Sequence, residues 1–326
     1  MKDIFCEKRD IAARLEPVLW ELLEKCVLCP RRCGVNRLAG EKGFCALAGE
    51  HVPIASYCVH RGEEPAISGH NGSGTIFFGH CNLGCIYCQN QSISDNSIPM
   101  DKNMASVAEL SGIMLSLQQA GCHNINLVTP THVLPYIVSA LKIAFERGLS
   151  IPVVYNCGGY ERAGIIKMLD GLVDIYLPDF KYMDSGLASL CSHAPDYPET
   201  AAAAFKEMYR QTGPDLILKN GTEIARRGLI VRHLVLPGNV ENSIMVLEWM
   251  AKELSNKLHL SLMSQYYPAQ ERGKLPPQLN RTLLHSEYET VAAKAVELGF
   301  ENGWFQEPDS HKTYRPDFKK KHPFEG

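Results

Sequence analysis

Residues 74–96 read GTIFFGHCNLGCIYCQNQSISDN, and the rest of the chain can be understood from this stretch. A short apolar run, residues 75–78, leads into Cys81, Cys85 and Cys88, which have CxxxCxxC spacing. A tetrahedral site for one metal ion takes four protein ligands, whereas a cubane iron-sulfur cluster can take three and leave one iron open. The loop therefore favours an open-iron cluster over the alternatives, which are buried free cysteines or part of a zinc site.

The composition limits the function classes. With 326 residues the chain can form one large α/β domain and a small additional one. A net charge of −3 and a pI near 6.5 give no general attraction to nucleic acid or anionic lipid, which disfavours a nucleic-acid partner. No apolar run approaches the roughly 18 residues that span a bilayer, and residues 1–18 show no secretory signal. We therefore expect a cytoplasmic protein with no membrane association.

A second group of cysteines follows an amphipathic helix predicted over residues 11–25, in whose first turn we expect Pro17. The segment CVLCPRRCGVNRLAGEKGFC contains Cys26, Cys29, Cys33 and Cys45. Four thiols with a tight leading pair and interspersed glycines predict a closed metal site. Zinc, a single iron or a further iron-sulfur cluster would suit it, whereas a reducing compartment disfavours a disulfide.

Other polar residues near these cysteines carry weaker signals. Arg31 and Arg32 lie inside the four-cysteine segment, and we expect both to be solvated. The histidines of the connecting segment 51–73 could ligate a metal, although satisfied or exposed histidines are commoner. We expect the five dispersed cysteines to be packing residues: Cys6, Cys58, Cys122, Cys157 and Cys191.

From residue 74 the pattern alternates between short apolar runs and amphipathic stretches. Strands are predicted at 75–78, 124–129, 151–155, 173–178, 229–236 and 259–266, and helices at 104–120, 133–147, 160–169, 199–211, 241–255 and 286–298. Gly121, Gly148 and Gly299 follow three of these helices, where left-handed caps are favoured. Strict alternation predicts a parallel sheet with helical crossovers.

Polar and glycine residues collect where each predicted strand ends. The cysteine loop follows the first strand, and Thr129 to His132 follow the second. Asn156 to Tyr160 follow the third strand, and Asp179 to Lys181 follow the fourth. Because function gathers at the carboxyl ends of parallel strands, these loops predict one common site.

The motif CxxxCxφC, with Tyr87 as the aromatic residue φ, resembles that of the radical S-adenosylmethionine superfamily. The resemblance spans most of the chain and is closest to the activating enzymes of glycyl-radical enzymes such as pyruvate formate-lyase. The matching stretches are GSGTIFFGHCNLGCIYCQN, HNINLVTPTH, IPVVYNCGGYE, VDIYLPDFKYMD, IVRHLVLPGN and CVLCPRRCGVN. The resemblance implies a partial six-stranded (β/α) barrel, open at one side, that follows a small N-terminal cysteine-rich domain.

The resemblance also implies cofactors and chemistry. It places a 4Fe-4S cluster on Cys81, Cys85 and Cys88, with S-adenosylmethionine chelating the fourth iron. The bound sulfonium is cleaved to a 5'-deoxyadenosyl radical that abstracts a hydrogen, here from a glycine of a partner protein. A low-potential donor such as flavodoxin or ferredoxin would supply the electron.

Further residue roles follow from position in the resemblance. Tyr87 is expected near the adenine, and Asn156 and Asp179 where activating enzymes bind a monovalent cation. Lys181 lies where a basic residue serves the ligand or substrate. The second loop usually carries a Gly-Gly-Glu motif that accepts from the methionine amine, and this chain has Thr129, Pro130 and Thr131 there.

This chain also departs from the activating enzymes, many of which insert further cysteines directly after the first motif. Here the extra cysteines lie upstream, at residues 26–45. Two other hypotheses therefore stay open: radical modification of a peptide, RNA or small metabolite, or a non-catalytic metal-cysteine binding module. We expect residues 1–73 to form the metal-binding segment, 74–307 the barrel, and 308–326 a solvated tail.

Overall fold

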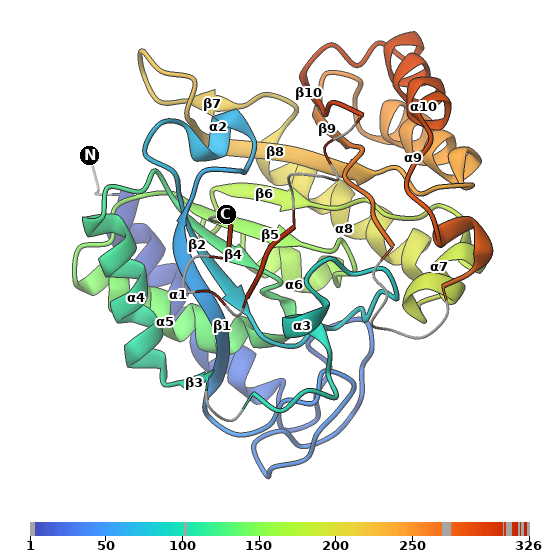
Figure 1. Ribbon diagram of the computed structural model, residues 1–326. Coiled ribbons are helices and arrows are strands. Elements are labelled where there is room, and N and C mark those ends of the chain that lie inside the picture. Colours follow the sequence, from blue (N-terminus) through green and yellow to red (C-terminus); the bar gives the residue numbers. More distant parts are fainter. Residues whose placement is uncertain are drawn as a thin grey trace.

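A curved, mostly parallel sheet forms the centre of the molecule (Figure 1). The computed structural model describes residues 4–100, 103–268 and 275–308, and in the tail 310, 315–318, 320, 323 and 324. The strands run in the order β10-β9-β8-β6-β5-β4-β2-β1-β3, and β7 pairs with β8 outside this path. Their bounds are β1 Val52–His60, β2 Ser73–Phe78, β3 Met104–Ala105, β4 Ile125–Val128, β5 Val153–Cys157, β6 Ile175–Pro178, β7 Ile217–Leu218, β8 Ala225–Leu234, β9 His259–Met263 and β10 Gly303–Phe305.

The predicted six-stranded parallel core is confirmed. Strands β2, β4, β5, β6, β8 and β9 pair in parallel in this order. The register keeps their carboxyl ends level, because Phe77 pairs with Val128 and Val128 with Asn156. Level strand ends bring the following loops together at one edge of the sheet.

The sheet is larger than predicted at both edges. β10 adds a parallel strand beside β9, and β1 pairs antiparallel with β2. The prediction that residues 51–73 form a connection was therefore wrong for β1. Pro53 and the irregular apolar pattern of β1 hide the strand, whose position depends on pairing with the wholly buried β2. Within the described residues the path of strands does not close, so the barrel is partial.

The longer helices cover the outer side of the sheet (Figure 1), whereas the short helices α2 and α3 pack against residues of its other face. Their bounds are α1 Ile4–Glu21, α2 Pro65–Ser68, α3 Gln91–Ser94, α4 Val107–Gln119, α5 Leu134–Glu146, α6 Ala163–Met168, α7 Ser185–Ser192, α8 Tyr197–Thr212, α9 Val240–Glu253 and α10 His285–Glu297. All six predicted crossover helices are present, and Gly121, Gly148 and Gly299 have the predicted positive φ. Helix α7 was not predicted. None of the described helices is long and apolar enough to cross a membrane.

Helix α1 differs from its prediction. It begins by Ile4 and ends at Glu21, so Pro17 lies in its interior and not in its first turn. The helix packs on α5, where Trp20 Nε1 donates to Ser139 Oγ at 2.9 Å and Leu19 is fully buried. Lys8 forms an ion pair with Asp174 of the barrel. Tertiary contacts therefore stabilise a helix whose interior proline removes one backbone bond.

The described part of the C-terminal tail lies against the barrel. Phe318 packs edge to face against Phe77 of β2 and Phe324 packs on it with a tilted ring, with ring centroids 5.2 and 5.6 Å apart. Phe324 also lies 3.9 Å from the ring of His60. The expectation of a solvated tail was therefore wrong for these two aromatics, whose apolar area is covered by β1 and β2. Lys319 and Lys321 lie outside the described residues.

Candidate active site

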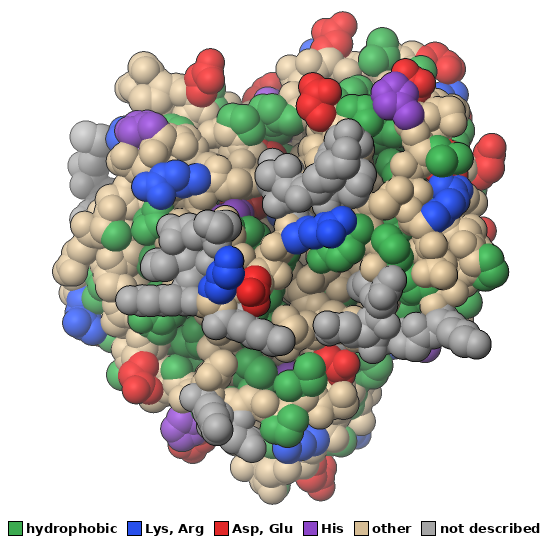
Figure 2. All heavy atoms as spheres, in the orientation of Figure 1, with side chains coloured by type: hydrophobic (Ala, Val, Ile, Leu, Met, Phe, Trp, Pro, Cys, Tyr) green, Lys and Arg blue, Asp and Glu red, His purple; other side chains and the backbone are tan. Residues whose placement is uncertain are grey.

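A cavity of about 310 Å³ opens at the carboxyl ends of the parallel strands. This volume lies within the usual range for small-molecule sites. Apart from Thr131, its lining contains every residue to which the sequence analysis gave a role with the cluster or S-adenosylmethionine: Cys81, Cys85, Cys88, Tyr87, Thr129, Asn156, Asp179 and Lys181. The level strand ends explain this convergence. Figure 2 shows the surface of the molecule in the orientation of Figure 1, with charges of both signs interspersed.

The three cysteines of the loop lie around this cavity as separate ligands. Cys81 Sγ accepts from the Leu83 amide at 3.3 Å, Cys88 Sγ from Ser94 Oγ at 3.3 Å, and Cys85 Sγ from Ser192 Oγ at 3.0 Å. Among the described residues, no three His, Cys, Asp or Glu side chains converge where one metal ion could bind. A cubane cluster binds each thiolate through a different iron, so three separate thiols around one cavity are compatible with such a cluster.

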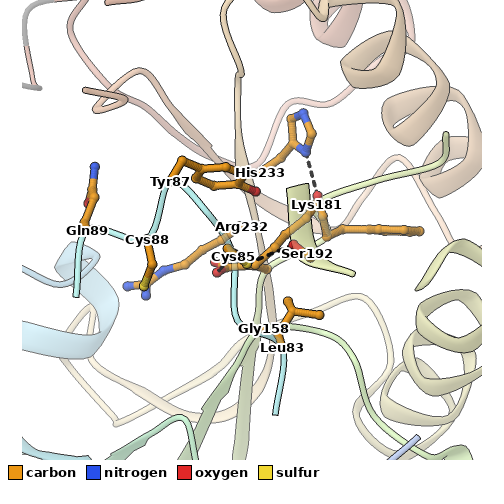
Figure 3. Close-up of polar contacts among 12 residues, drawn as sticks. Leu83, Cys85, Tyr87, Cys88, Gln89, Gly158, Lys181, Ser192, Arg232 and His233 are labelled. Carbon is orange, nitrogen blue, oxygen red and sulfur yellow. Dashed lines mark hydrogen bonds and ion pairs between the residues drawn. The ribbon is translucent and has the colours of Figure 1, made fainter. Parts of the chain in front are cut away.

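Asp179 and Lys181 place a charged pair beside the cysteines. Lys181 Nζ lies 2.6 Å from Asp179 Oδ2. Burial lowers the pKa of Lys181, but the charges of Asp179, Cys85 and Cys88 outweigh it and raise that pKa above its usual value. Burial raises the pKa of Cys85, and Lys181 counteracts the rise. In Figure 3, Cys85, Lys181 and Ser192 meet near the centre of the view. The ammonium therefore stabilises thiolates at this site.

Tyr87 lines the cavity, and its hydroxyl belongs to a buried network. Tyr87 and Tyr182 share a hydrogen bond of 2.6 Å between their hydroxyls, and Tyr182 shares one of 2.7 Å with Ser192. Ser192 then donates to the sulfur of Cys85. The position of Tyr87 in the sequence predicted a place near an adenine but gave no sign of this network. Such outer contacts fix the orientation of metal ligands.

The two threonines of the second loop lie in different environments. Thr129 lines the cavity with a positive φ of 60°, and its amide donates to the Asn156 carbonyl at 2.8 Å. Thr131 is buried, and its hydroxyl donates to the carboxylate of Glu161. Only Thr129 is therefore placed to contact a ligand in the cavity, although the sequence analysis expected both.

A buried ion cluster was missed by the sequence analysis. Arg232 of β8 forms ion pairs with Glu63 and Glu64, whose segment joins β1 to α2. Its Nε donates to Glu64 Oε1 at 2.7 Å, and all three residues line the cavity. An arginine in the middle of an apolar strand needs a buried partner, and this was the available signal. The partners could not be located, because they lie in a turn-rich connection.

Three glutamines form a second missed feature of the lining. Gln89 Nε2 donates to the Gln265 carbonyl at 2.7 Å, and Gln265 Nε2 donates to Gln89 Oε1 at 3.1 Å. Gln306 Nε2 donates to Gln265 Oε1 at 2.8 Å. They come from the cysteine loop and from the segments that follow β9 and β10. Side-chain amides of this kind can pair with peptide groups of a ligand.

The four N-terminal cysteines lie around a second, small cavity of about 10 Å³. Burial raises the pKa of the Cys29 thiol to about 12, and the Cys45, Cys26 and Cys33 thiols add to this rise. The cysteines do not converge on one point as they are placed. Arg37 lines the same cavity and is 1% exposed, and its Nε and Nη2 have no hydrogen-bond partner within the described residues. A buried cation with free donors is best stabilised by a group with net negative charge.

The other predicted ligands lie apart from these groups. His51 is exposed, His60 is buried beside Phe324, and His70 lies against His123 with ring centroids 4.8 Å apart. The dispersed cysteines are buried as expected except Cys6, which is exposed on α1. None of the twelve cysteines, all of which lie in the described part of the chain, forms a disulfide. The disulfide alternative is thus absent from the structure.

No family model matches the chain, but the chain is similar to solved structures and to a curated protein. By fold the chain is similar to methylornithine synthase (PylB), with 14% sequence identity and a TM-score of 0.48. The match covers 72% of this chain and 63% of that chain. By fold it is also similar to Streptococcus suis SuiB bound to S-adenosylmethionine, with 12% sequence identity and a TM-score of 0.46. This match covers 72% of this chain and 50% of that chain. The chain thus spans less than two thirds of each solved structure. By sequence it is 31% identical over 284 residues to the uncharacterized protein MJ0674 of Methanocaldococcus jannaschii, covering 85% of this chain and 75% of that protein. The chain belongs to the family of this archaeal protein.

Proposed function

We propose that the chain is a radical S-adenosylmethionine enzyme. The observation that carries the proposal is the cavity at the strand ends, which Cys81, Cys85 and Cys88 line without converging on one point. Three separate, hydrogen-bonded thiols at one cavity suit a 4Fe-4S cluster, which can be bound by three cysteines and leave one iron open. When bound, this cluster would supply the electron that cleaves S-adenosylmethionine reductively to the 5'-deoxyadenosyl radical.

The chain's own residues have distinct tasks in this proposal. Lys181 offsets the negative charge of Cys85 and Cys88, while Asp179 holds its ammonium in place at 2.6 Å. Asn156 and Thr129 present polar groups from neighbouring strand ends, where the amine and carboxylate of the cofactor can be bound. Asp179 and Asn156 are also candidates for a monovalent cation. Tyr87 offers its ring to the cavity while its hydroxyl is occupied by Tyr182.

We also propose a metal at the four N-terminal cysteines, either zinc, a single iron or a further iron-sulfur cluster. Four thiolates around a divalent ion would leave a net charge of about −2. Arg37, buried with two nitrogens unpaired, supplies a positive charge at the same cavity. For a single ion the four thiols must turn toward one another, because they do not converge as placed.

For the substrate we propose a glycine of a partner protein, as in the activating enzymes. The amides of Gln89, Gln265 and Gln306 support a peptide ligand, because they line the cavity and match the donors and acceptors of a backbone. A low-potential donor such as flavodoxin or ferredoxin would deliver the electron.

The cleavage step can be tested directly. Wild-type protein is reconstituted anaerobically with iron and sulfide, reduced with dithionite and incubated with S-adenosylmethionine, and 5'-deoxyadenosine is measured. We expect product from wild type and none from Cys85→Ala, with Cys122→Ala as the control because Cys122 lies outside the cavity. Absence of product from wild type with a full iron content would overturn the proposal.

The substrate class needs a separate measurement. After incubation with candidate partner proteins, samples are split, exposed to oxygen or kept anaerobic, and analysed by mass spectrometry. Oxygen-dependent backbone cleavage at a glycine would support the partner-protein substrate. A stable mass shift on a peptide, RNA or metabolite would instead support a radical modification enzyme.

A further inference from the structure

Arg31 makes an unusual set of contacts for a residue that the sequence analysis expected to be solvated. Its Nε donates to the Asn82 carbonyl at 3.0 Å and its Nη2 to the Leu83 carbonyl at 2.9 Å. The same Nη2 donates to the Ser192 carbonyl at 2.9 Å, and Nη1 donates to the His193 carbonyl. One guanidinium of the four-cysteine segment therefore holds four carbonyls that lie far away in the chain.

These carbonyls belong to the two segments that surround Cys85. Asn82 and Leu83 form the loop between Cys81 and Cys85, while Ser192 and His193 end helix α7. The end of α7 contacts the loop independently, because the Ile86 amide donates to the Cys191 carbonyl at 2.8 Å. Ser192 Oγ donates to Cys85 Sγ at 3.0 Å. A cation is also favoured at a helix C-terminus by the helix dipole.

A second residue of the four-cysteine segment reinforces this contact. Phe44 stacks on Arg31, whose Cζ lies 3.9 Å from the ring centroid. A Cβ added to Gly84 of the loop would lie 3.2 Å from Phe44 Cζ, so this glycine permits the close approach. The Phe44 carbonyl accepts from Asn96 Nδ2 at 2.8 Å, and Asn96 Oδ1 accepts from the Cys81 amide at 2.9 Å. Cys81 is thereby connected to Phe44 through Asn96, while the loop residues that follow Cys81 are held by Arg31.

From these contacts we propose that Arg31 is a positioning residue that holds the three-cysteine loop in its cluster-binding shape and couples it to the four-cysteine segment. The inference rests on the proposed function, because it assumes that the loop binds a cluster. Only an arginine can make this set of bonds, since its planar fork has five donors whereas lysine has one ammonium. Loss of the fork releases the Asn82 and Leu83 carbonyls and the end of α7 together.

The test compares Arg31→Ala and Arg31→Lys with Arg32→Ala. Arg32 is exposed and neighbours Arg31 in sequence, so its replacement is a matched control. Each reconstituted protein is analysed for iron and sulfide, and the loss of cluster absorbance is followed after addition of an iron chelator. The electron paramagnetic resonance spectrum of the reduced cluster is recorded with and without S-adenosylmethionine. Melting temperatures of the unreconstituted proteins report on folding.

We expect Arg31→Ala to lose its cluster about tenfold faster than wild type, with an altered resonance spectrum, because contacts behind metal ligands change affinity by this order. Arg31→Lys should be intermediate, and Arg32→Ala should match wild type. If Arg31→Ala fails to fold, the rate of cluster loss and the resonance spectrum of Arg31→Lys test the proposal instead. Wild-type cluster loss and spectra in both Arg31 variants would overturn the inference while leaving the proposed function intact. A wild-type protein that binds no cluster would overturn the proposed function itself.

Discussion

Glu161 is a buried carboxyl with a perturbed pKa and no ion pair within the described residues. It is 1% exposed and accepts hydrogen bonds from Thr131 and, at 3.2 Å, from the Tyr155 hydroxyl. Burial raises its pKa to about 7, and the hydrogen bonds from Thr131, Tyr155 and Cys157 only partly oppose this rise. Below about pH 7 the folded protein therefore favours the protonated form of this side chain.

The stability of the apoprotein should depend on this group. Because the folded pKa lies above the unfolded one, the stabilisation is fully present below about pH 4.5 and is lost as pH rises through about 7. Relative to Glu161→Gln, wild type should lose about 3 kcal/mol of unfolding free energy between pH 4.5 and 7.5. Urea unfolding at both pH values measures this.

The comparison with Glu161→Gln removes the contributions of other titrating groups, such as the buried His132. Glu24→Gln is the control, because it makes the same chemical change at an exposed position. Parallel profiles for wild type and Glu161→Gln would show that the carboxyl is ionised in the folded protein.

At the scale of elements, the edge strand β10 depends on one glycine. Gly303 has φ +125°, and a Cβ there would lie 2.0 Å from the Leu260 carbonyl oxygen of β9. The strand is short, and Gly303 pairs directly with Leu260. Trp304 of the same strand lines the main cavity, so this pairing also shapes the candidate site.

Gly303→Ala should therefore separate β10 from β9 and lower the unfolding free energy by about 2 kcal/mol or more. Gly112→Ala is the matched control, because Gly112 lies inside α4 with nothing within 4 Å of an added Cβ. The control should gain about 0.5–1 kcal/mol from higher helix propensity. Chemical unfolding of both variants measures whether the unfolding free energy falls in Gly303→Ala and rises in Gly112→Ala. An unfolding free energy of Gly303→Ala equal to that of wild type would mean that β9 shifts to accept the methyl group.

At the scale of the whole molecule, the N-terminal segment and the barrel share one hydrophobic core. Leu19 and Leu23 belong to the same buried cluster as Tyr136 and Leu141 of α5. Trp20 and Tyr136 pack edge to face with ring centroids 4.9 Å apart. The predicted boundary near residue 73 thus crosses a continuous core and a paired sheet, because β1 pairs with β2.

We expect the two parts to unfold together. A variant that keeps only Trp20 and one that keeps only Trp249 report on the N-terminal helix and on α9. Their fluorescence transitions in urea should coincide, since unfolding one part exposes the apolar surface of the other. An earlier Trp20 transition would instead support the division into separate domains.

Whether a prediction succeeded depended on how far apart in the sequence the interacting residues lie. The cysteine loop and the parallel strands carry local signals in spacing and periodicity, so their positions could be predicted. Arg31 carries no such signal, because its acceptors lie 51 to 162 residues away in the sequence. Glu63 and Glu64 were missed for the same reason, as their partner Arg232 lies 168 or more residues along the chain.

The sequence alone determined the alternation of strands and helices, the three thiols on one loop and the clustering of polar residues at strand ends. These follow from short-range spacing, which each segment carries by itself. The tertiary structure alone decided that Thr131 turns away to Glu161, that Arg31 holds the cysteine loop, and that aromatic tail residues lie on β2. Each of these depends on which distant groups remain buried and need a partner, and that is fixed only when the sheet brings its loops together.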